Sequence, residues 1–449
     1  MSLPVQLLES LANVKGFDRE AFERVHESGE QVTSIRLNPV KPVADLLFAT
    51  VSMPWCPYGR YLAERPSFTL DPLFHAGAYY VQEASSMFLW HALQQTIGSD
   101  TEKKVLDLCA APGGKSTLLA SYFTNGLVVA NEVIKSRASI LVENITKWGS
   151  DHVIVTNNDP SHFQSIPGFF DAMVVDAPCS GSGLFRKDPD AVNEWSTDNV
   201  QLCCQRQQRI LADILPALKE DGILLYSTCS YSMDEDEDIA DWLVTEMSME
   251  SVPIAIPAEW NIIETVSSQT HATGYRFYPD KIRGEGFFIA AFRKKQPATD
   301  IRWKEQTLSA VSRQERQMLD TFINLPAELS LFKAADAIRA IPTKWLHDLQ
   351  VLAKHLYIKK AGVEIGSIKG KDVIPSHELA LSELSGGFTA QPLSREQSLQ
   401  YLRRKEISLP YSPKGWNLVS FGGLPLGWVK VLPNRVNNYY PAEWRILKE

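Results

Sequence analysis

Two cysteines stand directly beside apolar runs, where a thiol could act as a nucleophile. Cys179 follows the run FDAMVVDAP (170–178), and Cys229 closes the run GILLYSTC (222–229). If these runs are neighbouring strands, both thiols lie at one edge of a sheet. A thiolate is a soft nucleophile, and its addition to carbon 6 of a cytosine makes carbon 5 able to attack an electrophilic methyl group. One cysteine could serve as the nucleophile while the second assists its release.

A third segment, DLCAAPGGKST (107–117), has the composition of a ligand-binding turn between a strand and a helix. Gly113 and Gly114 allow the backbone to approach a ligand closely, and the N-terminus of the following helix favours a carboxylate or a phosphate. A Walker P-loop would need glycine at position 109, where this chain has Cys109, so an ATPase is disfavoured. For this loop alone, a tight turn without a ligand remains an open alternative.

Acidic residues end three further apolar runs. Glu132 stands roughly 20 residues after the glycine-rich turn, where an acid can bind both ribose hydroxyls of a nucleoside. Asp159 is placed to contact an adenine edge, and Asp176 ends the run that precedes Cys179. A single acid at a strand end is more often a helix cap or a turn former. Because these strand ends are expected at the same edge of one sheet, a nucleoside cofactor is the better interpretation.

The elements that would hold these residues alternate between strand and helix patterns. The expected strands are the apolar runs at 105–110, 127–132, 152–159, 170–178 and 222–229. The helix before the last strand has Ile210, Leu211, Ile214, Leu215 and Leu218 at helical spacing, with Asp221-Gly222 after its C-terminus. This alternation predicts an α/β fold with a parallel, Rossmann-like sheet. The run GFFIAAFRKK (286–295) is expected to add an edge strand.

The motifs taken together resemble those of the RNA 5-methylcytosine methyltransferases, the Fmu/Nop2/NSUN family. The resemblance covers roughly residues 30–297 and is carried by DLCAAPGGKS (107–116), NE (131–132), DAPCSGSG (176–183), RKDPD (186–190), YSTCS (226–230) and GEGFF (284–288). It implies a methyltransferase sheet that uses S-adenosyl-L-methionine and acts on RNA.

The resemblance also implies a role for each thiol. Cys229, in the Thr-Cys motif, would be the covalent nucleophile, and Cys179, in the Pro-Cys motif, would help to release the enzyme from the product. Asp176 would lie near both the cofactor amine and the target base. DNA cytosine methyltransferases use the Pro-Cys cysteine as the nucleophile instead, so the pair Thr228-Cys229 favours RNA over DNA.

Further site residues follow from the same resemblance. The segment that would cradle the methionine part of the cofactor comprises Cys109, Ala110, Ala111, Pro112, Gly113, Gly114 and Lys115. Glu132 would bind the ribose and Asp159 the adenine. Pro178 and Lys187 are candidates for the substrate pocket, with a solvated lysine as the alternative for Lys187. Arg137 matches a basic position of the family, and we interpret it as a residue of a helix surface.

The flanking segments indicate how RNA would be recognised. We expect an N-terminal RNA-recognition module at 1–85, the catalytic domain at 86–297, a first C-terminal domain at 298–385 and a β-rich, PUA-like domain at 386–449, with a linker at 294–306. The tail resembles that of the RsmF/YebU group of bacterial 16S rRNA (cytosine-C5) methyltransferases. Residues suited to phosphate contact and base stacking are Lys359, Lys360, Arg403, Arg404, Lys405, Trp428, Lys430 and Arg435.

Composition narrows the classes of partner. The chain has 449 residues and a formal net charge of −8, which divides into −15 over residues 1–300 and +7 over 301–449. This balance argues against a general polyanion binder but leaves a basic tail. The six cysteines form no CxxC pair, so no metal site is expected, and the acidic run 234–238 is interpreted as a solvated helix start.

The sequence shows no pattern typical of a targeting signal. The segment 1–22 has the pattern of an amphipathic helix without the basic and apolar regions of a signal peptide, and no apolar run is long enough to span a membrane. We therefore expect a cytoplasmic protein without a membrane partner, acting as a monomer.

The favoured function is methylation of a cytosine in the decoding region of 16S rRNA, on free RNA or on the small ribosomal subunit, through a covalent bond between Cys229 and carbon 6. A tRNA cytosine-5 methyltransferase is the alternative of the same class. A ribosome-assembly factor that binds RNA without catalysis is the alternative of another class, which the intact thiols and glycine turn disfavour.

Overall fold

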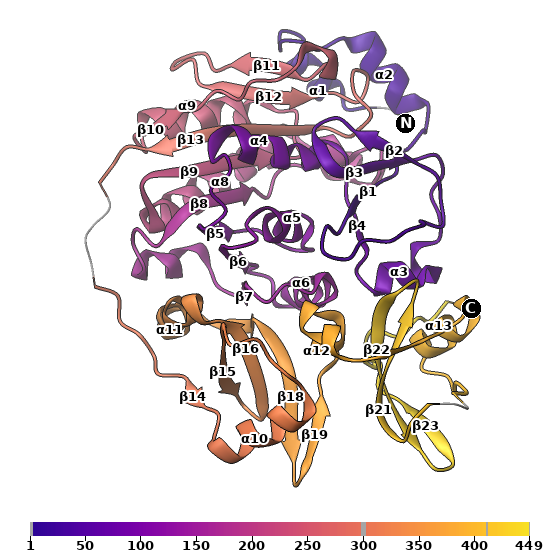
Figure 1. Cartoon of the computed structure of the whole chain (residues 1–449). Coiled ribbons are helices and arrows are strands. Elements are labelled where there is room, and N and C mark those ends of the chain that lie inside the picture. The colour runs from indigo at the N-terminus through magenta and orange to yellow at the C-terminus, as the bar shows by residue number, and fades with distance from the viewer. Residues whose placement is uncertain (1–2, 298–301, 410–411, 449) are drawn as a thin grey trace.

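A computed structural model of the chain describes residues 3–297, 302–409 and 412–448. Its centre is one large sheet with the strand order β11-β12-β13-β9-β8-β5-β6-β7-β17, and β10 pairs with β13 outside this path (Figure 1). The parallel strands are β5 (Lys104–Asp107), β6 (Leu127–Asn131), β7 (Val153–Thr156), β8 (Phe170–Asp176) and β9 (Leu218–Thr228). The predicted α/β class and the five predicted strands are confirmed.

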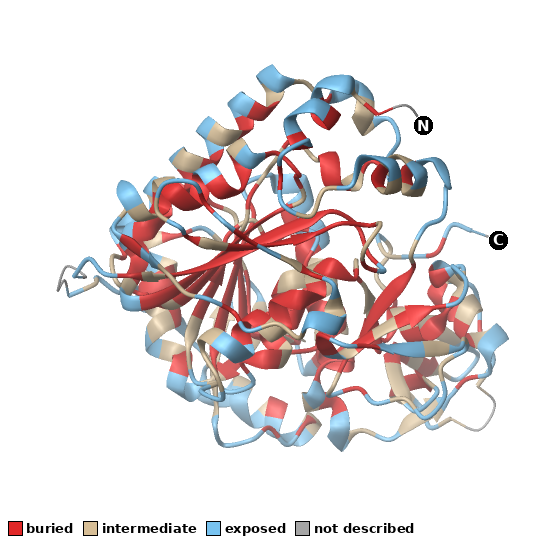
Figure 2. Cartoon of the chain, turned by 90° about the horizontal axis from the view of Figure 1, so that it is seen from above, coloured by how far each residue is buried: buried red, intermediate tan, exposed pale blue. Residues whose placement is uncertain are grey.

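Helices cover both faces of this sheet because successive strand residues point to opposite sides. Val105 packs under α4 (Leu89–Thr96), α5 (Gly114–Tyr122) and α6 (Lys135–Trp148) in one core. Leu106 packs under α8 (Thr197–Ile214), α9 (Glu237–Thr245) and α11 (Leu346–His355) in the other. The sheet strands are therefore buried at the centre of the molecule (Figure 2). This two-faced burial is what holds the strand ends in fixed register.

The outer strands of the sheet differ from the expectation for 286–295. Strand β13 (Phe287–Lys294) pairs antiparallel with β9 on one side, and with β12 (Thr273–Phe277) and β10 (Met249–Ser251) on the other. The edge is instead β11 (Ile263–Val266). The predicted edge strand is therefore internal, because three strands that the sequence pattern did not reveal, β10, β12 and β11, lie beyond it.

The opposite edge of the sheet is completed by a distant part of the chain. Strand β17 (Ile358–Ala361) pairs antiparallel with β7, and α11 packs into the same core as α8 and α9. The indole N–H of Trp303 donates to the carbonyl of Pro167, so the described part of the expected linker also packs on this domain; 298–301 lie outside the described residues. Strand β17 and helix α11, from the predicted first C-terminal domain, are thus part of the catalytic sheet and its core.

The N-terminal segment forms two helices and a small sheet. Helices α1 (Val5–Leu11) and α2 (Arg19–Glu27) replace the single predicted helix, because Gly16 has a positive φ of 82° between them. The sheet has the order β2-β3-β1-β4, with β2 (Thr50–Met53), β3 (Cys56–Leu62), β1 (Ser34–Leu37) and β4 (Tyr79–Val81). Helix α3 (Pro72–His75) precedes β4.

Two β-rich units follow in the tail (Figure 1). The first contains β14 (Ser309–Ala310), α10 (Arg313–Phe322), β15 (Leu329–Ala334), β16 (Ala337–Pro342), β18 (Val363–Lys369), β19 (Asp372–Pro375) and α12 (His377–Leu381). The second contains β20 (Ala390–Pro392), α13 (Arg395–Leu402), β21 (Gly415–Phe421), β22 (Leu424–Leu432) and β23 (Arg435–Asn438). The second unit packs on the N-terminal module, where the Tyr440 hydroxyl lies 3.3 Å from Nδ1 of His75.

One boundary inside the catalytic domain also differs from the sequence expectation. Helix α8 ends at Ile214, a short 3-10 turn follows, and strand β9 begins at Leu218. Leu218 and the Asp221-Gly222 pair therefore lie within the strand rather than on the helix and after it. The helical spacing of the apolar residues continued by chance into a strand that is buried on both faces.

Candidate active site

The two thiols meet where β8 and β9 end side by side. These strands are parallel neighbours, with Asp176 opposite Ser227, so the residues that follow them emerge at the same edge. The Sγ atoms of Cys179 and Cys229 lie 3.0 Å apart, and both cysteines are free and partly buried. The hydrogen bond with Cys229, together with burial, raises the pKa of Cys179 well above its usual range. Cys179 is therefore held in its protonated thiol form.

An ion pair joins the thiol edge to the glycine-rich loop. Nζ of Lys115 lies 2.8 Å from Oδ2 of Asp176, and the hydroxyl of Ser227 donates to Oδ1 at 2.8 Å. Burial alone would lower the pKa of Lys115, but the charge and the hydrogen bond of Asp176 raise it instead. Lys115 thus remains a cation, and its ammonium also lies 5.3 Å from the ring centre of Phe287. This arrangement fixes the Asp176 carboxylate between the loop and the thiols.

The glycine-rich loop leads from β5 into α5. Gly113 has a φ of 119°, which non-glycine residues rarely adopt, and a Cβ at this position would lie 3.2 Å from Leu141. Helix α5 then begins at Gly114, so its first backbone N–H groups face the open end of the loop. Burial raises the pKa of the Cys109 thiol strongly, which keeps this cysteine neutral. It behaves as a small buried side chain.

A pocket of about 180 Å³ opens beside this loop. One wall is formed by the loop and Asp176. The remaining lining residues come from the end of the N-terminal module and the residue that follows it: Tyr80, Val81, Gln82, Glu83 and Ser86. These residues were not predicted from the sequence to belong to the cofactor site. Their only signal was their position just before the catalytic domain.

Glu132 lies at the end of β6 with its side chain almost fully buried. Its Oε1 accepts a hydrogen bond from the backbone N–H of Ile134 at 2.9 Å, while Oε2 lies 3.7 Å from the guanidinium of Arg137. Arg137 also donates to the carbonyl of Ala111 at 2.7 Å. The interpretation of Arg137 as a helix-surface residue is therefore incomplete, because it ties Glu132 to the loop. A carboxylate fixed this way fits the two hydroxyls of a ribose.

Asp159 has a local role in the structure. Its Oδ1 accepts hydrogen bonds from the backbone N–H and the hydroxyl of Ser161, at 3.1 and 2.7 Å. These hydrogen bonds lower the pKa of Asp159. The residue is thus the cap of the turn at Pro160–Ser165, as isolated strand-end acids commonly are. Contact of Asp159 with an adenine stays a prediction.

The two substrate-pocket candidates are placed differently. Pro178 adjoins Cys179, and its carbonyl accepts a hydrogen bond from Gln207 at 3.1 Å. The side chain of Lys187 is exposed. It is the neighbouring Arg186 that turns inward, where Nη1 lies 3.6 Å from the buried carboxylate of Glu285. The structure therefore favours the solvated-lysine alternative for Lys187.

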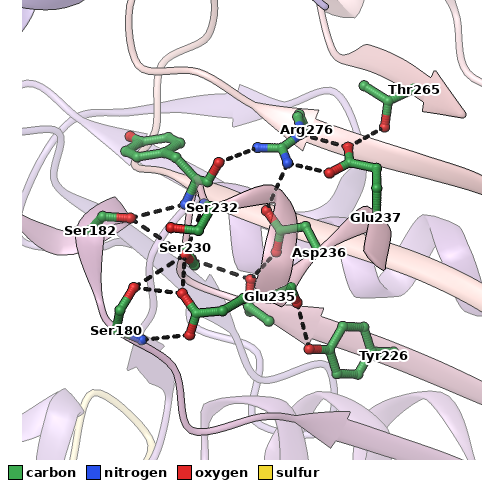
Figure 3. A network of polar contacts seen from close by, with 12 residues as sticks. Ser180, Ser182, Tyr226, Ser230, Ser232, Glu235, Asp236, Glu237, Thr265 and Arg276 are labelled. Atoms are coloured by element: carbon green, nitrogen blue, oxygen red, sulfur yellow. Dashed lines mark hydrogen bonds and ion pairs between the residues drawn. The ribbon is translucent and has the colours of Figure 1, made fainter. Parts of the chain in front are cut away.

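The acidic run 234–238 lies in a different environment from the one predicted. The prediction of a solvated helix start is wrong for Glu235, Asp236 and Glu237, which are buried. Their carboxylates point toward Arg276 and toward the two cysteine loops, which are the segments after β8 (177–183, the Cys179 loop) and after β9 (229–232, the Cys229 loop) (Figure 3). The burial of these acids could not be predicted from the sequence pattern, because a run of acids has the same composition whether it faces water or buried hydrogen-bond donors.

Two of the residues expected at the RNA surface are also buried. Lys360 is paired with Glu378 at 2.5 Å, and the indole N–H of Trp428 donates to the carbonyl of Ser376 at 2.8 Å. The other basic residues of that set are at least partly exposed. An aromatic pair that the sequence analysis missed lies beside them: the rings of Trp416 and Tyr439 are 4.4 Å apart, and Nζ of Lys430 is 5.2 Å from the Trp416 ring.

The described residues 3–297, 302–409 and 412–448 show neither a metal cluster nor a membrane-spanning helix. No group of three or more His, Cys, Asp or Glu side chains is placed to hold a metal ion there. No described helix combines the length and the apolar character needed to cross a bilayer.

Comparisons with known families match three parts of the chain. Residues 94–293 match the model of the 16S rRNA methyltransferase RsmB/F family, residues 388–446 match the RsmF PUA domain, and residues 3–84 match the N-terminal domain of 16S rRNA methyltransferase RsmF. The matched segments include every cysteine and acid of the candidate site.

Individual relatives extend this similarity over most of the chain. The ribosomal RNA small subunit methyltransferase F of Shewanella loihica is 30% identical over 436 residues, covering 91% of this chain and 88% of its own. The protein of the same name from Psychromonas ingrahamii is 31% identical, covering 87% and 85%. A methyltransferase homologue from Pyrococcus horikoshii matches 65% of this chain with a TM-score of 0.51 at 29% identity. NSun6 from the same organism, at 19% identity and a TM-score of 0.54, shows the shared fold.

Proposed function

The chain belongs to the 16S rRNA methyltransferase RsmB/F family and is an S-adenosylmethionine-dependent RNA methyltransferase; from this premise we propose that it methylates carbon 5 of a cytosine in 16S rRNA. The observation that carries the chemical part of the proposal is the pair of thiols at 3.0 Å on adjacent strand ends, beside the Lys115–Asp176 ion pair. An RNA methyltransferase that modifies an amine or a hydroxyl has no need of two such thiols.

The proposed reaction begins at Cys229. Its sulfur bonds to carbon 6 of the cytosine, and the electrons of the 5,6 double bond make carbon 5 nucleophilic. S-adenosylmethionine, when bound, supplies the electrophilic methyl group that carbon 5 takes up. Carbon 5 then releases its proton to water, the electrons of that C–H bond re-form the 5,6 double bond, and the Cys229 sulfur leaves carbon 6 with the electrons of the C–S bond. Cys179, held as a neutral thiol 3.0 Å away, is placed to return a proton to the leaving sulfur of Cys229.

Different residues of the pocket would bind different parts of the cofactor. The loop from Cys109 to Lys115 would hold the methionine part, since the helix N-terminus favours a carboxylate. Glu132 would bind the ribose hydroxyls, and Asp159 would lie toward the adenine. Asp176 would face the cofactor amine and the base.

RNA recognition is proposed for the two flanking regions. We infer that the segments 1–85, 86–297, 298–385 and 386–449 serve as an RNA-recognition module, the catalytic domain, a connecting domain and a PUA-like domain. Lys430 and Arg435 supply positive charge, and Trp416 and Tyr439 offer rings for base stacking. Similarity to RsmF-type sequences at both flanks favours 16S rRNA over tRNA.

The experiment that tests this function is bisulfite mapping of RNA treated with the purified enzyme and S-adenosylmethionine. Naked 16S rRNA, small ribosomal subunits and total tRNA are treated in parallel, with Cys229→Ala as the inactive control. We expect new 5-methylcytosine in 16S rRNA from free RNA or subunits. Methylation confined to tRNA would support the alternative substrate, and methyl groups without any 5-methylcytosine would overturn the proposed chemistry.

A further inference from the structure

The two cysteine loops are tied together by one buried carboxylate. Oε2 of Glu235 accepts hydrogen bonds from the hydroxyls of Ser180 and Ser230, each at 2.6 Å (Figure 3). Oε1 accepts from the backbone N–H of Ser180 at 2.8 Å and from Gln207 at 3.2 Å. Ser180 immediately follows Cys179 and Ser230 immediately follows Cys229. A single side chain therefore bonds to the residue next to each thiol.

The environment of this carboxylate shows how much of its hydrogen-bonding capacity is used. Glu235 is fully buried, and its four partners are neutral donors rather than a cation. Burial raises its pKa, and the hydrogen bonds from Ser180 and Ser230 offset only part of that shift. A buried carboxylate is costly unless its lone pairs are satisfied. All four bonds must form together, which favours one arrangement of the two loops.

The neighbouring acids hold the rest of the Cys229 loop. The hydroxyl of Thr228 donates to Asp236 at 2.6 Å, and Arg276, which is paired with Asp236 and Glu237, donates to the carbonyl of Tyr231 at 2.8 Å. The residues on both sides of Cys229 are thus bonded to the segment 235–237 or to its arginine partner. Only Glu235 also reaches the Cys179 loop.

We propose that Glu235 is a positioning residue for methyl transfer, which sets the relative placement of the Cys179 and Cys229 thiols. The inference rests on the proposed roles of these two thiols. The two loops are also joined directly, because Gly183 N–H donates to the carbonyl of Cys229 at 2.8 Å and Tyr231 N–H donates to the hydroxyl of Ser182 at 2.9 Å. Loss of the four Glu235 bonds would therefore shift the two loops relative to each other, and the two sulfurs would be displaced from their positions at the target base. A displacement of about 1 Å at a reacting group can cost on the order of 100-fold in rate.

The test compares three variants in steady-state methylation of 16S rRNA. Glu235→Ala should lower kcat about 100-fold while the KM for RNA and the Kd for S-adenosylmethionine change little, because the cofactor loop is anchored elsewhere. Glu235→Gln should retain activity within about 5-fold, since its carbonyl can face Ser180 N–H and the two serine hydroxyls can turn to accept from its amide. Asp238→Ala removes an exposed acid of the same run and is the matched control.

A second readout reports the thiol geometry directly. Mild oxidation by diamide, which is reduced to a hydrazine as two thiols form a disulfide, should crosslink Cys179 to Cys229 readily in the wild type and the Gln variant. The Ala variant should crosslink at least 10-fold more slowly. If Glu235→Ala does not fold, Ser230→Ala removes one of the four bonds and should also lower kcat relative to the wild type.

The outcomes separate this inference from the proposed function. Wild-type kcat in Glu235→Ala, together with an inactive Cys229→Ala, would overturn the positioning role alone. An active Cys229→Ala would overturn the proposed chemistry whatever Glu235 does. Loss of S-adenosylmethionine affinity equal to the loss of kcat would assign Glu235 a general structural role and contradict the proposal.

Discussion

The two loops that carry the chemistry are held in contrasting ways. The cofactor loop is anchored by Arg36, which comes from β1 of the N-terminal module and donates to the carbonyl of Gly114 at 3.1 Å and to the hydroxyl of Thr117 at 2.5 Å. The cysteine loops are anchored by Glu235, six residues beyond Cys229 in the sequence. One anchor crosses a domain boundary and the other lies within the catalytic domain.

The location of each anchor indicates which property it influences: Arg36 the cofactor pocket, and Glu235 the placement of the two thiols. Arg36 is fully buried, and burial lowers its pKa to about 10, so it is still charged near neutral pH. Its Nε donates to Gln82, which lines the cofactor pocket, at 2.8 Å. Arg36 therefore links the position of the N-terminal module to the shape of this pocket, and we expect cofactor binding to depend on that link. The four bonds of Glu235 lie within the catalytic domain, and the N-terminal module reaches the Cys229 loop through packing of Phe22 on Tyr231.

The largest effect that separates the two loops is expected from Arg36→Ala. Its loss removes hydrogen bonds from a charged group, each worth about 1.5–3 kcal/mol, so affinity for S-adenosylmethionine should fall on the order of 10- to 100-fold. Calorimetric titration with the cofactor measures this change. Crosslinking of the two thiols should stay at the wild-type rate.

The matched control for this variant is Arg60→Ala, in the same small sheet, whose guanidinium bonds to carbonyls of its own strand. Unchanged cofactor affinity in Arg36→Ala, or equal losses of cofactor affinity in both variants, would contradict the role of Arg36 as the anchor of the cofactor loop.

A smaller effect is expected from the RNA surface, which should act on neither loop. Reversing charge in Lys430→Glu and Arg435→Glu should raise the KM for RNA and reduce the salt dependence of binding, by about one unit of slope per lost phosphate contact. Filter binding across a salt series measures this slope. An unchanged slope in the double variant would remove this surface from the RNA interface.

A pH dependence of stability is expected on the cofactor side. Burial raises the pKa of Asp107 to about 7, although the hydrogen bond from Ser116 at 2.6 Å opposes this shift. The folded state therefore binds a proton more tightly than the unfolded state, whose carboxyl titrates near pH 4. Stability should fall as pH rises between about 4 and 7 and level off above that range. Asp107→Asn, without cofactor, should flatten this part of a thermal-unfolding series; an identical slope would contradict the assignment.

Much of the site was predictable because it lies on a sheet whose pattern is local. Five apolar runs predicted five parallel strands, and parallel strands bring their C-terminal ends to one edge. Cys179, Cys229 and Asp176 are consequently brought together as expected. The wall formed by Tyr80 and Gln82 was not predicted, because it depends on how a separate module docks.

Burial of charge was the other feature that the sequence could not reveal. Glu235 and Lys360 look solvated by composition, yet each lies beside complementary groups that come from distant segments. Trp428 looked available for stacking and is instead part of the core of the tail. In each case the deciding information is a tertiary contact rather than a local pattern.

The measurement that tests the central account most directly is capture of a covalent complex between the enzyme and 16S rRNA on a denaturing gel. Cys179→Ala should accumulate a band that survives denaturation, because the bond from Cys229 to the base forms but is released slowly. The double variant Cys179→Ala/Cys229→Ala should give no such band. A stable complex in Cys229→Ala, with none in Cys179→Ala, would exchange the roles of the two thiols and contradict the account.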